Sequence, residues 1–271
     1  MGDDNEQARS TFSSAQSQSK GSFNENEAYT MVSKCGSEFI AVMIFVLVGS
    51  LQANTKWDGV LHAALCHGIA IFVLVACFAH ISGGHVNPAV TVGIAAAGKM
   101  PLVDAAFYIT SQMGGSFVGA LIVRALLQYD AYVAIQGGAT LCSSSVTWYQ
   151  GLFAETLTTY CLVQTVLLTA VDSTAILAPL AIGFSIIMDI FAAGAISGAS
   201  MNPGRSFGPN VVASIFIRDQ LQDHFWTFHW IYYIGPVVGA LFAAALYRIF
   251  FAKEGRTLLS ESMSGKSSKS C

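Results

Sequence analysis

Six apolar stretches, each about as long as a helix that crosses a lipid bilayer, set the strongest limit on how this chain can fold. They lie near 36–53, 59–80, 104–125, 149–171, 176–194 and 229–251. A helix rises about 1.5 Å per residue, so about 20 apolar residues cover the roughly 30 Å of hydrocarbon in a bilayer. Charged residues make up only 11 % of the chain, against about 25 % in a soluble domain. The sequence therefore predicts an all-α membrane protein with six transmembrane helices.

The segments outside these stretches are polar. Residues 1–33 are rich in Ser, Gln, Asn and acidic residues and lack the apolar core of a signal peptide, and residues 252–271 are similarly polar. We expect a disordered tail at each end and a membrane domain over 34–251. Six crossings put both tails on the same side of the membrane. More Lys and Arg fall on that side than on the other, which predicts that both tails are cytoplasmic.

The chain also repeats itself at an offset of 115 to 120 residues. Three landmarks keep this register: Asn87-Pro88 with Asn202-Pro203, Glu38 with Glu155, and GSFVGAL at 115–121 with GPVVGAL at 235–241. Each repeat, 34–125 and 149–251, holds three crossings, so the second must enter the membrane from the opposite side. Such inverted repeats are typical of membrane transport proteins, in which the substrate path lies between the repeats.

The two Asn-Pro pairs are predicted to start short helices inside the membrane, because Asn is a favoured N-cap and Pro is favoured at the first helical position. Only about ten residues separate Pro88 from Lys99, which is about 15 Å or half a bilayer, and the segment after Pro203 is similarly short. Glycine-rich backbone precedes each Asn and is tolerated at membrane depth only where it is buried in protein or lines a watery path. Two re-entrant half-helices should therefore meet N-terminus to N-terminus at the centre.

Asn87 and Asn202 are the candidate pore residues. Their motifs also include Pro88, Ala89, Pro203 and Gly204. A capping Asn uses its side-chain oxygen as an acceptor, so we expect both amide NH₂ groups to point into the path and donate to a passing molecule. Each half-helix carries about half a positive charge at its N-terminus, which repels cations at the midpoint. A path of this kind favours small neutral solutes.

On these residues the chain resembles the aquaporin family over almost all of 34–251. The motifs HVNPAVT and MNPGRSFGP carry the resemblance together with the paired Glu38 and Glu155, and the runs ALCHGIA, MDIFAAG and FHWIYYIGP are most similar to aquaporin-8 and the plant tonoplast intrinsic proteins. The resemblance implies the aquaporin fold and a homotetramer with one pore per subunit. It also implies passive flux of water, and in this branch of ammonia and hydrogen peroxide, with protons and ions excluded.

The resemblance further implies a selectivity filter outside the asparagine pair. Its four positions here are His67, Ile190, Ala199 and Arg205. A guanidinium is permanently charged and repels cations. Ile190 and Ala199 supply an apolar wall, so we expect a bore somewhat wider than that of a strict water channel. Ammonia and hydrogen peroxide should pass, and glycerol should not.

Several residues are assigned structural roles. Glu38 and Glu155 are costly in lipid, and we interpret them as acceptors for N–H groups of the re-entrant loops. His80 and His85 bracket the first loop and are expected to stabilise it by hydrogen bonds. Gly204 stands where the family has Ala, from which we expect a slightly looser half-helix and more room beside Asn202.

Other function classes fit less well. No Ser/His/Asp, paired-carboxylate or metal-ligand set falls on the predicted path, so neither an enzyme nor a cofactor or metal is expected, and no basic patch suggests nucleic acid. The expected partners are water and small neutral solutes, the lipid bilayer and further copies of the chain. The alternative that stays open is a membrane junction or structural protein with this fold and little flux. The membrane could be the plasma membrane or an intracellular one.

Overall fold

A computed structural model describes residues 28–54, 59–173 and 175–253, and within these ranges the regular structure is entirely helical. The predicted tails lie almost wholly outside the described residues. The first helix begins at Met31, three residues before the predicted start of the membrane domain at residue 34. The last helical segment ends at Phe251, as predicted.

Six long helical segments follow the six apolar stretches. They are α2 (Met31–Leu51), α3 (Val60–Ser82), α5 (Leu102–Leu126), α7 (Trp148–Val166) continued by the π-helical turn η2 (Leu167–Asp172), α8 (Ala178–Ala193), and α10 (Ile231–Leu246) continued by the π-helical turn η4 (Tyr247–Phe251). Five of these segments are long and apolar enough to cross a membrane, and α8 is a shorter apolar helix of 16 residues. Apart from the start of α2, the predicted boundaries agree with the structure within a few residues.

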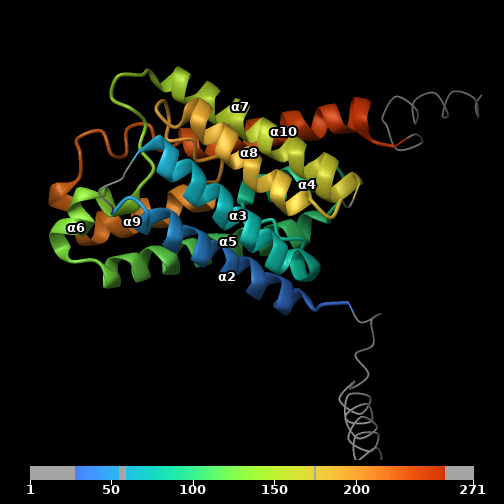
Figure 1. Cartoon of the computed structure of the whole chain (residues 1–271), viewed down its shortest axis with the longest axis horizontal. Coiled ribbons are helices and arrows are strands. Elements are labelled where there is room, and N and C mark those ends of the chain that lie inside the picture. Colours follow the sequence, from blue (N-terminus) through green and yellow to red (C-terminus); the bar gives the residue numbers. More distant parts are fainter. Residues whose placement is uncertain (1–27, 55–58, 174, 254–271) are drawn as a thin grey trace, which may run out of the picture. The chain divides into compact units, whose positions relative to one another are not determined.

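Two short helices lie inside the bundle, where the Asn-Pro pairs predict them. α4 (Pro88–Ala96) has 9 residues, and α9 (Pro203–Phe216) has 14 and contains Pro209. Figure 1 shows α4 in one half of the bundle and α9 in the other, each with the long helices around it. The connections at the α9 end carry the short helices α6 (Tyr129–Ala134), η1 (Gln136–Gly138) and η3 (Arg218–Gln220).

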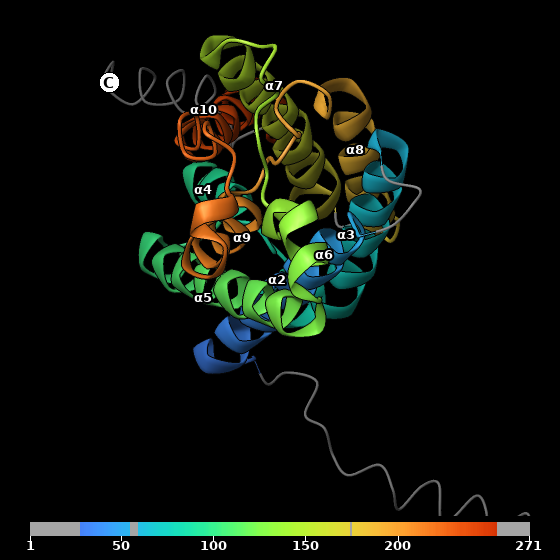
Figure 2. The same cartoon turned by 90° about the vertical axis from the view of Figure 1, so that its left-hand side faces the viewer.

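The long helices pack in pairs, α2 with α5, α7 with α10, and α3 with α8 (Figure 2). Glycines allow the close approach. Gly115 and Gly119 of α5 lie against the backbone of α2, and the repeat-related Gly235 and Gly239 of α10 lie against the backbone of α7. Small residues serve this purpose in lipid, where hydrophobic burial alone does not hold helices together. Both repeats therefore use the same packing device.

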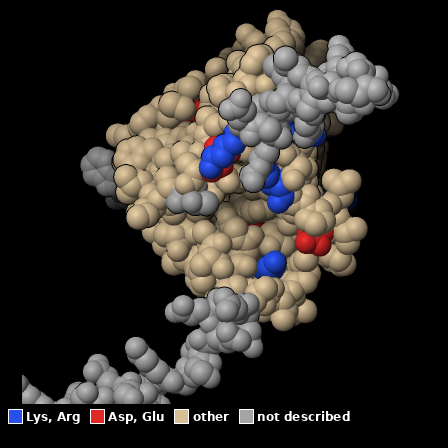
Figure 3. Space-filling model, turned by 90° about the vertical axis from the view of Figure 1, so that its right-hand side faces the viewer, with Lys and Arg blue, Asp and Glu red and all other residues tan. Residues whose placement is uncertain are grey.

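One end of the bundle is hollowed at its centre, and Lys and Arg side chains lie around the hollow (Figure 3). α10 ends on this side of the molecule, and α4 lies in the same half (Figure 1). By the charge count along the sequence, this is the end that we expect to face the cytoplasm.

Candidate functional site

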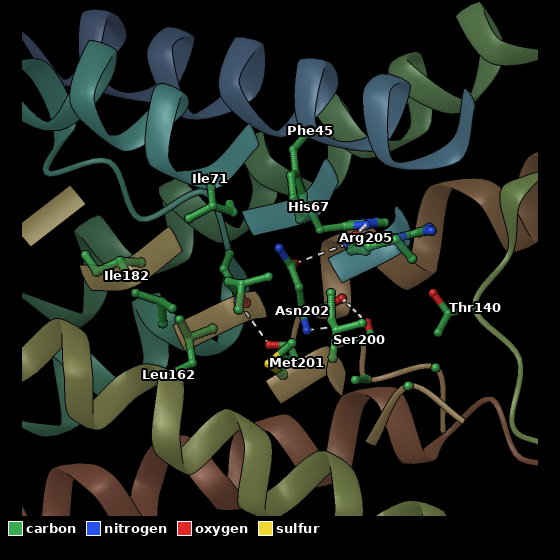
Figure 4. Close-up of a pocket in the computed structure, with 18 of the residues that line it drawn as sticks. Phe45, His67, Ile71, Thr140, Leu162, Ile182, Ser200, Met201, Asn202 and Arg205 are labelled. Carbon is green, nitrogen blue, oxygen red and sulfur yellow. Dashed lines mark hydrogen bonds between the residues drawn. The ribbon is translucent and has the colours of Figure 1, made fainter. Parts of the chain in front are cut away.

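A cavity of about 330 Å³ lies between the two repeats. Its lining includes Gln52 and Thr140 towards one end of the bundle and Val166 and Ala170 towards the other. Figure 4 shows the middle of this cavity, with the side chain of Asn202 close to its centre. The cavity therefore follows the long axes of the helices, as a passage across a membrane would.

The two half-helices are capped by their asparagines. Asn87 Oδ1 accepts a hydrogen bond from the backbone N–H of Ala89 at 2.8 Å, and Asn202 Oδ1 accepts one from that of Arg205 at 3.1 Å. Proline occupies the first turn of both helices. The N-termini abut, because a Cβ placed on Gly204 would lie 3.3 Å from Cδ of Pro88. The local sequence chemistry thus places two helix N-termini at the middle of the cavity.

Each asparagine NH₂ group makes a hydrogen bond within the protein, whereas capping alone predicts that both groups are free to bind a solute. Asn87 Nδ2 donates to the carbonyl oxygen of Met201 at 2.9 Å, and Asn202 Nδ2 donates to that of Val86 at 3.0 Å. Each amide therefore ties its own half-helix to the loop of the other repeat. Because an amide NH₂ carries two hydrogens, each asparagine retains one donor for the cavity, which both residues line.

The residue before each asparagine holds an unusual backbone conformation. Val86 and Met201 both have φ 53°, in the left-handed region that non-glycine residues seldom occupy. Such a conformation costs about 1–3 kcal/mol and persists only where the surroundings enforce it. Here the carbonyl of each residue accepts the cross-loop bond, and the N–H of each is bound by a buried glutamate. The loops are thereby fixed from both sides.

Glu38 of α2 binds the first loop. Its oxygens accept four hydrogen bonds, from Ser82 Oγ (2.6 Å) and His85 N (2.9 Å) on Oε1 and from Val86 N (2.7 Å) and Gln112 Nε2 (2.8 Å) on Oε2. Tyr108 of α5 adds a bond from its hydroxyl to the Ser82 carbonyl at 2.9 Å. The carboxylate is fully buried, so these donors replace the water it would otherwise bind.

Glu155 of α7 binds the second loop in the same manner. It accepts from Ser197 Oγ (2.6 Å) and Ser200 N (2.9 Å) on Oε1 and from Met201 N (2.8 Å) on Oε2. Tyr232 of α10 donates its hydroxyl to the Ser197 carbonyl at 2.6 Å. The two glutamates thus make the contacts that a loop-supporting role requires, and the inverted repeat extends to individual hydrogen bonds.

The four residues proposed for the filter all line the cavity, and Figure 4 shows His67 beside Arg205. The Arg205 guanidinium donates to the carbonyl oxygens of Gly138 at 2.9 Å and Gly49 at 3.4 Å. His67 Nδ1 lies 2.8 Å from the carbonyl oxygen of Ala63 and donates to it, because a carbonyl can only accept. Nε2 of His67 is thereby left as an acceptor, and it lies against Gly49 of α2, where a Cβ would be only 2.6 Å away.

The remaining two filter residues are apolar and buried. Ile190 lies near the end of α8, and Ala199 lies in the second loop with φ 45°. They contribute no hydrogen-bonding side chain to this part of the cavity. The side-chain donors at this level therefore come from Arg205, because His67 already donates its ring N–H to the Ala63 carbonyl.

The other predicted residues are placed as follows. His85 lines the cavity, and its Nδ1 lies 3.1 Å from Thr91 Oγ1, whereas His80 is exposed in the last turn of α3. The extra room expected at Gly204 is absent, because a Cβ there would lie 3.2 Å from Asn202 Oδ1 and equally close to the Pro88 ring. Asp189, an acidic residue within the apolar helix α8, is also buried but does not line the cavity, and its Oδ2 has no hydrogen-bond partner among the described residues.

Some functional contacts have no signal in the sequence. Backbone carbonyls of Gly49 and Gly138 hold Arg205, and any residue type could supply a carbonyl. Gly138 is nevertheless required for its conformation, since it has φ 77° and a Cβ there would collide with Ser50. Thr140, which lines the cavity, lies in a connection with no helical pattern.

The fold and cavity together define an integral multi-pass membrane protein built as a channel. The sequence profile of the major intrinsic protein family matches residues 25–247. The chain is 40 % identical over 229 residues to "Probable aquaporin TIP1-2" of Oryza sativa subsp. japonica, covering 79 % of this chain and 85 % of that protein. It is 35 % identical over 236 residues to aquaporin-8 of Notomys alexis, covering 85 % and 87 % of the two chains.

Among solved structures, the X-ray structure of the aquaglyceroporin from Plasmodium falciparum superposes with a TM-score of 0.70 at 24 % identity, covering 80 % of this chain and 96 % of that one. This likeness establishes the aquaporin fold. The chain belongs to the major intrinsic protein family, the aquaporins. It is accordingly a transmembrane water channel and not an enzyme, and its resemblance to aquaporin-8 and the tonoplast intrinsic proteins is confirmed.

Proposed function

We propose that this channel passes water together with small neutral solutes, including ammonia and hydrogen peroxide, and excludes protons and ions. The selectivity filter consists of His67, Ile190, Ala199 and Arg205, and the asparagine motifs at Asn87 and Asn202 form a second control point in mid-membrane. The membrane domain spans 34–251, or 31–251 when the extra helical residues of α2 are included.

One observation carries this proposal. The fixed donors of Asn87, Asn202 and Arg205 all lie on the wall of a single cavity whose other lining residues are largely apolar. A solute that accepts hydrogen bonds is stabilised there by these donors. A cation is repelled by the guanidinium and by the two helix N-termini. The aliphatic side chain of Ile190 leaves the filter without a further polar partner, which favours compact solutes over polyols.

Parallel flux measurements test the proposal. Purified protein in proteoliposomes is assayed by stopped-flow light scattering for water, by a pH-sensitive dye for ammonia, and by a peroxide-sensitive dye for hydrogen peroxide. We expect all three solutes to pass faster than through empty vesicles and glycerol to pass no faster. Ammonia and peroxide flux equal to that of empty vesicles would reduce the function to water alone.

The alternative, a junction or structural protein, requires the same fold and no flux. It would be favoured if water, too, passed no faster than through empty vesicles. The cavity supports the channel, because a purely adhesive protein has no use for paired donors along a passage through its centre.

The assembly and the orientation are also proposals. We propose a homotetramer with one pore per subunit and both termini in the cytoplasm. Large apolar side chains are exposed on α3 and α8, among them Ile69, Phe72, Phe184 and Met188, and lipid or a neighbouring subunit must cover them. Native mass spectrometry in detergent tests the tetramer, and protease access to terminal tags in intact cells tests the orientation.

A further inference from the structure

The side chain of Ser116, on α5, is bonded into the backbone of the half-helix α9. Its hydroxyl donates to the carbonyl oxygen of Gly204 and accepts from the backbone N–H of Gly208 at 2.9 Å. Ser116 is completely buried. It does not line the cavity, so it cannot touch a passing solute.

The two groups that Ser116 contacts belong to one helical turn. In an α-helix the N–H of residue i pairs with the carbonyl of residue i−4, which here joins Gly208 to Gly204. A hydroxyl bonded to both lies across that turn. Gly208 permits the approach, since a Cβ at this position would collide with the carbonyl and hydroxyl oxygens of Ser116.

The turn held in this way is the one that carries Arg205. At its start, Asn202 Oδ1 accepts from the N–H of Arg205, and beyond the backbone the guanidinium reaches Gly138 at 2.9 Å. Ser116 binds this turn from a neighbouring transmembrane helix, at the carbonyl of the residue before Arg205 and at the N–H of Gly208, three residues after it. The position of the guanidinium therefore depends on α5 as well as on the loops.

Among the described residues, no neighbouring helix bonds a hydroxyl to the backbone of the other half-helix, and Gln112 of α5 reaches α4 only through the side chain of Thr91, at 3.0 Å. By the repeat, Ser116 corresponds to Pro236 of α10, which has no hydroxyl, and Gly208 corresponds to Gly93 of α4. A Cβ on Gly93 would meet the apolar side chains of Val163 and Ala240. The asymmetry follows the chemistry, because only α9 carries a filter arginine.

We propose that Ser116 is a positioning residue for the pore, holding the first turn of α9 so that the Arg205 guanidinium keeps the filter narrow. Its hydroxyl sets the discrimination between water and larger neutral solutes, without contacting either. This inference rests on the proposed role of Arg205 in the filter. Ser116 is thus distinct from the asparagines and the filter residues that solutes meet.

Three variants separate positioning from general packing. Ser116→Ala removes the hydroxyl and little volume. Ser116→Thr keeps the hydroxyl, and Ser116→Cys takes its place if the threonine variant does not elute at the wild-type volume on gel filtration. Ser214→Ala is the matched control, since it removes a hydroxyl that bonds within the same half-helix far from Arg205, where it donates to the Asn210 carbonyl and accepts from Trp226.

The first measurement is amide hydrogen exchange of the peptide that covers residues 203–210, followed by mass spectrometry in proteoliposomes. We expect Ser116→Ala to speed exchange in this peptide up to about tenfold, the effect of losing one buried hydrogen bond. Ser214→Ala should leave this peptide unchanged. Equal exchange in Ser116→Ala and wild type would overturn the inference.

The second measurement is the ratio of glycerol to water permeability by stopped-flow light scattering. We expect Ser116→Ala to raise this ratio at least about twofold and Ser116→Thr, or the cysteine variant in part, to restore it. An unchanged ratio in Ser116→Ala would refute the effect on selectivity. Hydrogen exchange does not depend on solute flux, so it tests the backbone contact by itself. A wild-type channel that conducted nothing would refute the proposed function without deciding whether Ser116 holds the turn.

Discussion

Asn87 and Asn202 each hold the loop of the opposite repeat, with Nδ2 of Asn87 donating to the Met201 carbonyl at 2.9 Å and Nδ2 of Asn202 donating to the Val86 carbonyl at 3.0 Å. Both asparagines also cap their own half-helices. Each amide side chain therefore serves three purposes: it caps the N-terminus of its own half-helix, it binds the loop of the other repeat, and it leaves one N–H donor for the solute. Only Asn and Gln offer an acceptor oxygen and two N–H donors in one planar group, and Asn is the one that is favoured as a helix N-cap.

Replacing either asparagine by aspartate separates these purposes. Asn87→Asp and Asn202→Asp keep a good helix cap but lose the donor and place a carboxylate oxygen against a carbonyl. We expect each to lower stability by about 1–3 kcal/mol, the cost of an unpaired buried group, and to reduce water flux. Thermal unfolding in detergent and stopped-flow scattering measure the two effects. The exposed Asn54→Asp is the control, and wild-type flux in both pore variants would contradict the assigned role.

The guanidinium of Arg205 spans two carbonyls, those of Gly138 and Gly49, which a lysine ammonium on a flexible stem cannot reproduce. For Arg205→Lys we expect proton and ion exclusion to persist, because the charge is kept, while glycerol permeability rises as the neck loosens. Arg205→Ala should lose both barriers. Light scattering reports the glycerol flux and an entrapped pH dye reports the proton flux. Arg218→Lys, on the exposed surface, should behave as wild type.

If Arg205→Ala still excludes protons, as Arg205→Lys is expected to do, the charge of Arg205 is not the basis of exclusion. The half-helix N-termini would then be the main barrier, since both variants leave them in place.

The two loop-binding glutamates should differ in their tolerance of glutamine. Each Glu38 oxygen accepts two hydrogen bonds, so an amide NH₂ at either position faces two donors. Glu155 Oε2 accepts one, from Met201, and a glutamine can turn its NH₂ to that side. We expect Glu155→Gln to lower the melting temperature by about 3 to 10 °C and Glu38→Gln by more.

Differential scanning fluorimetry in one detergent measures this order. Asp130→Asn, an exposed charge change on the short helix α6, should leave the melting temperature in place. Equal losses for the two glutamates would mean that the number of donors on each oxygen does not set the cost.

The fold follows from features that are local in the sequence. Apolar length predicts the long helices, and Asn-Pro after a glycine-rich stretch predicts the half-helices, because capping and proline placement act over three or four residues. The repeat landmarks add the relative orientation. Apolar length does not predict that α2 begins as early as Met31, because a helix can extend beyond its membrane-spanning part through residues that are not apolar.

Less of the site than of the fold can be predicted from the sequence. The cross-loop bond from Asn87 reaches a residue 114 positions away, and Ser116 binds backbone groups 88 and 92 positions away. Contacts of this kind produce no periodic pattern in the sequence, and a bond to a backbone carbonyl does not restrict the type of residue that supplies it. Capping chemistry alone therefore predicts free asparagine amides and misses the cross-loop bonds. The roles of the two glutamates were within reach, because a buried carboxylate beside an unwound loop must accept its N–H groups.

The last prediction concerns Cys142, in the connection between η1 and α7, which faces outward if the termini are cytoplasmic. Its side chain is buried, Sγ lies 3.6 Å from the Ile196 carbonyl, and burial raises the pKa of the thiol. A raised pKa lowers the thiolate fraction at neutral pH, and the thiolate is the reactive form. We expect an impermeant maleimide applied to intact cells at pH 7.5 to label Cys142 slowly, and faster only as the pH is raised beyond the range of an ordinary thiol. Ser144→Cys in a Cys142→Ser background places an exposed thiol in the same connection and should label rapidly, with peptide mass spectrometry assigning the site. Labelling of Cys142 at the rate of the Ser144→Cys thiol would mean that this connection opens in the membrane, and no labelling of either would place it on the cytoplasmic side.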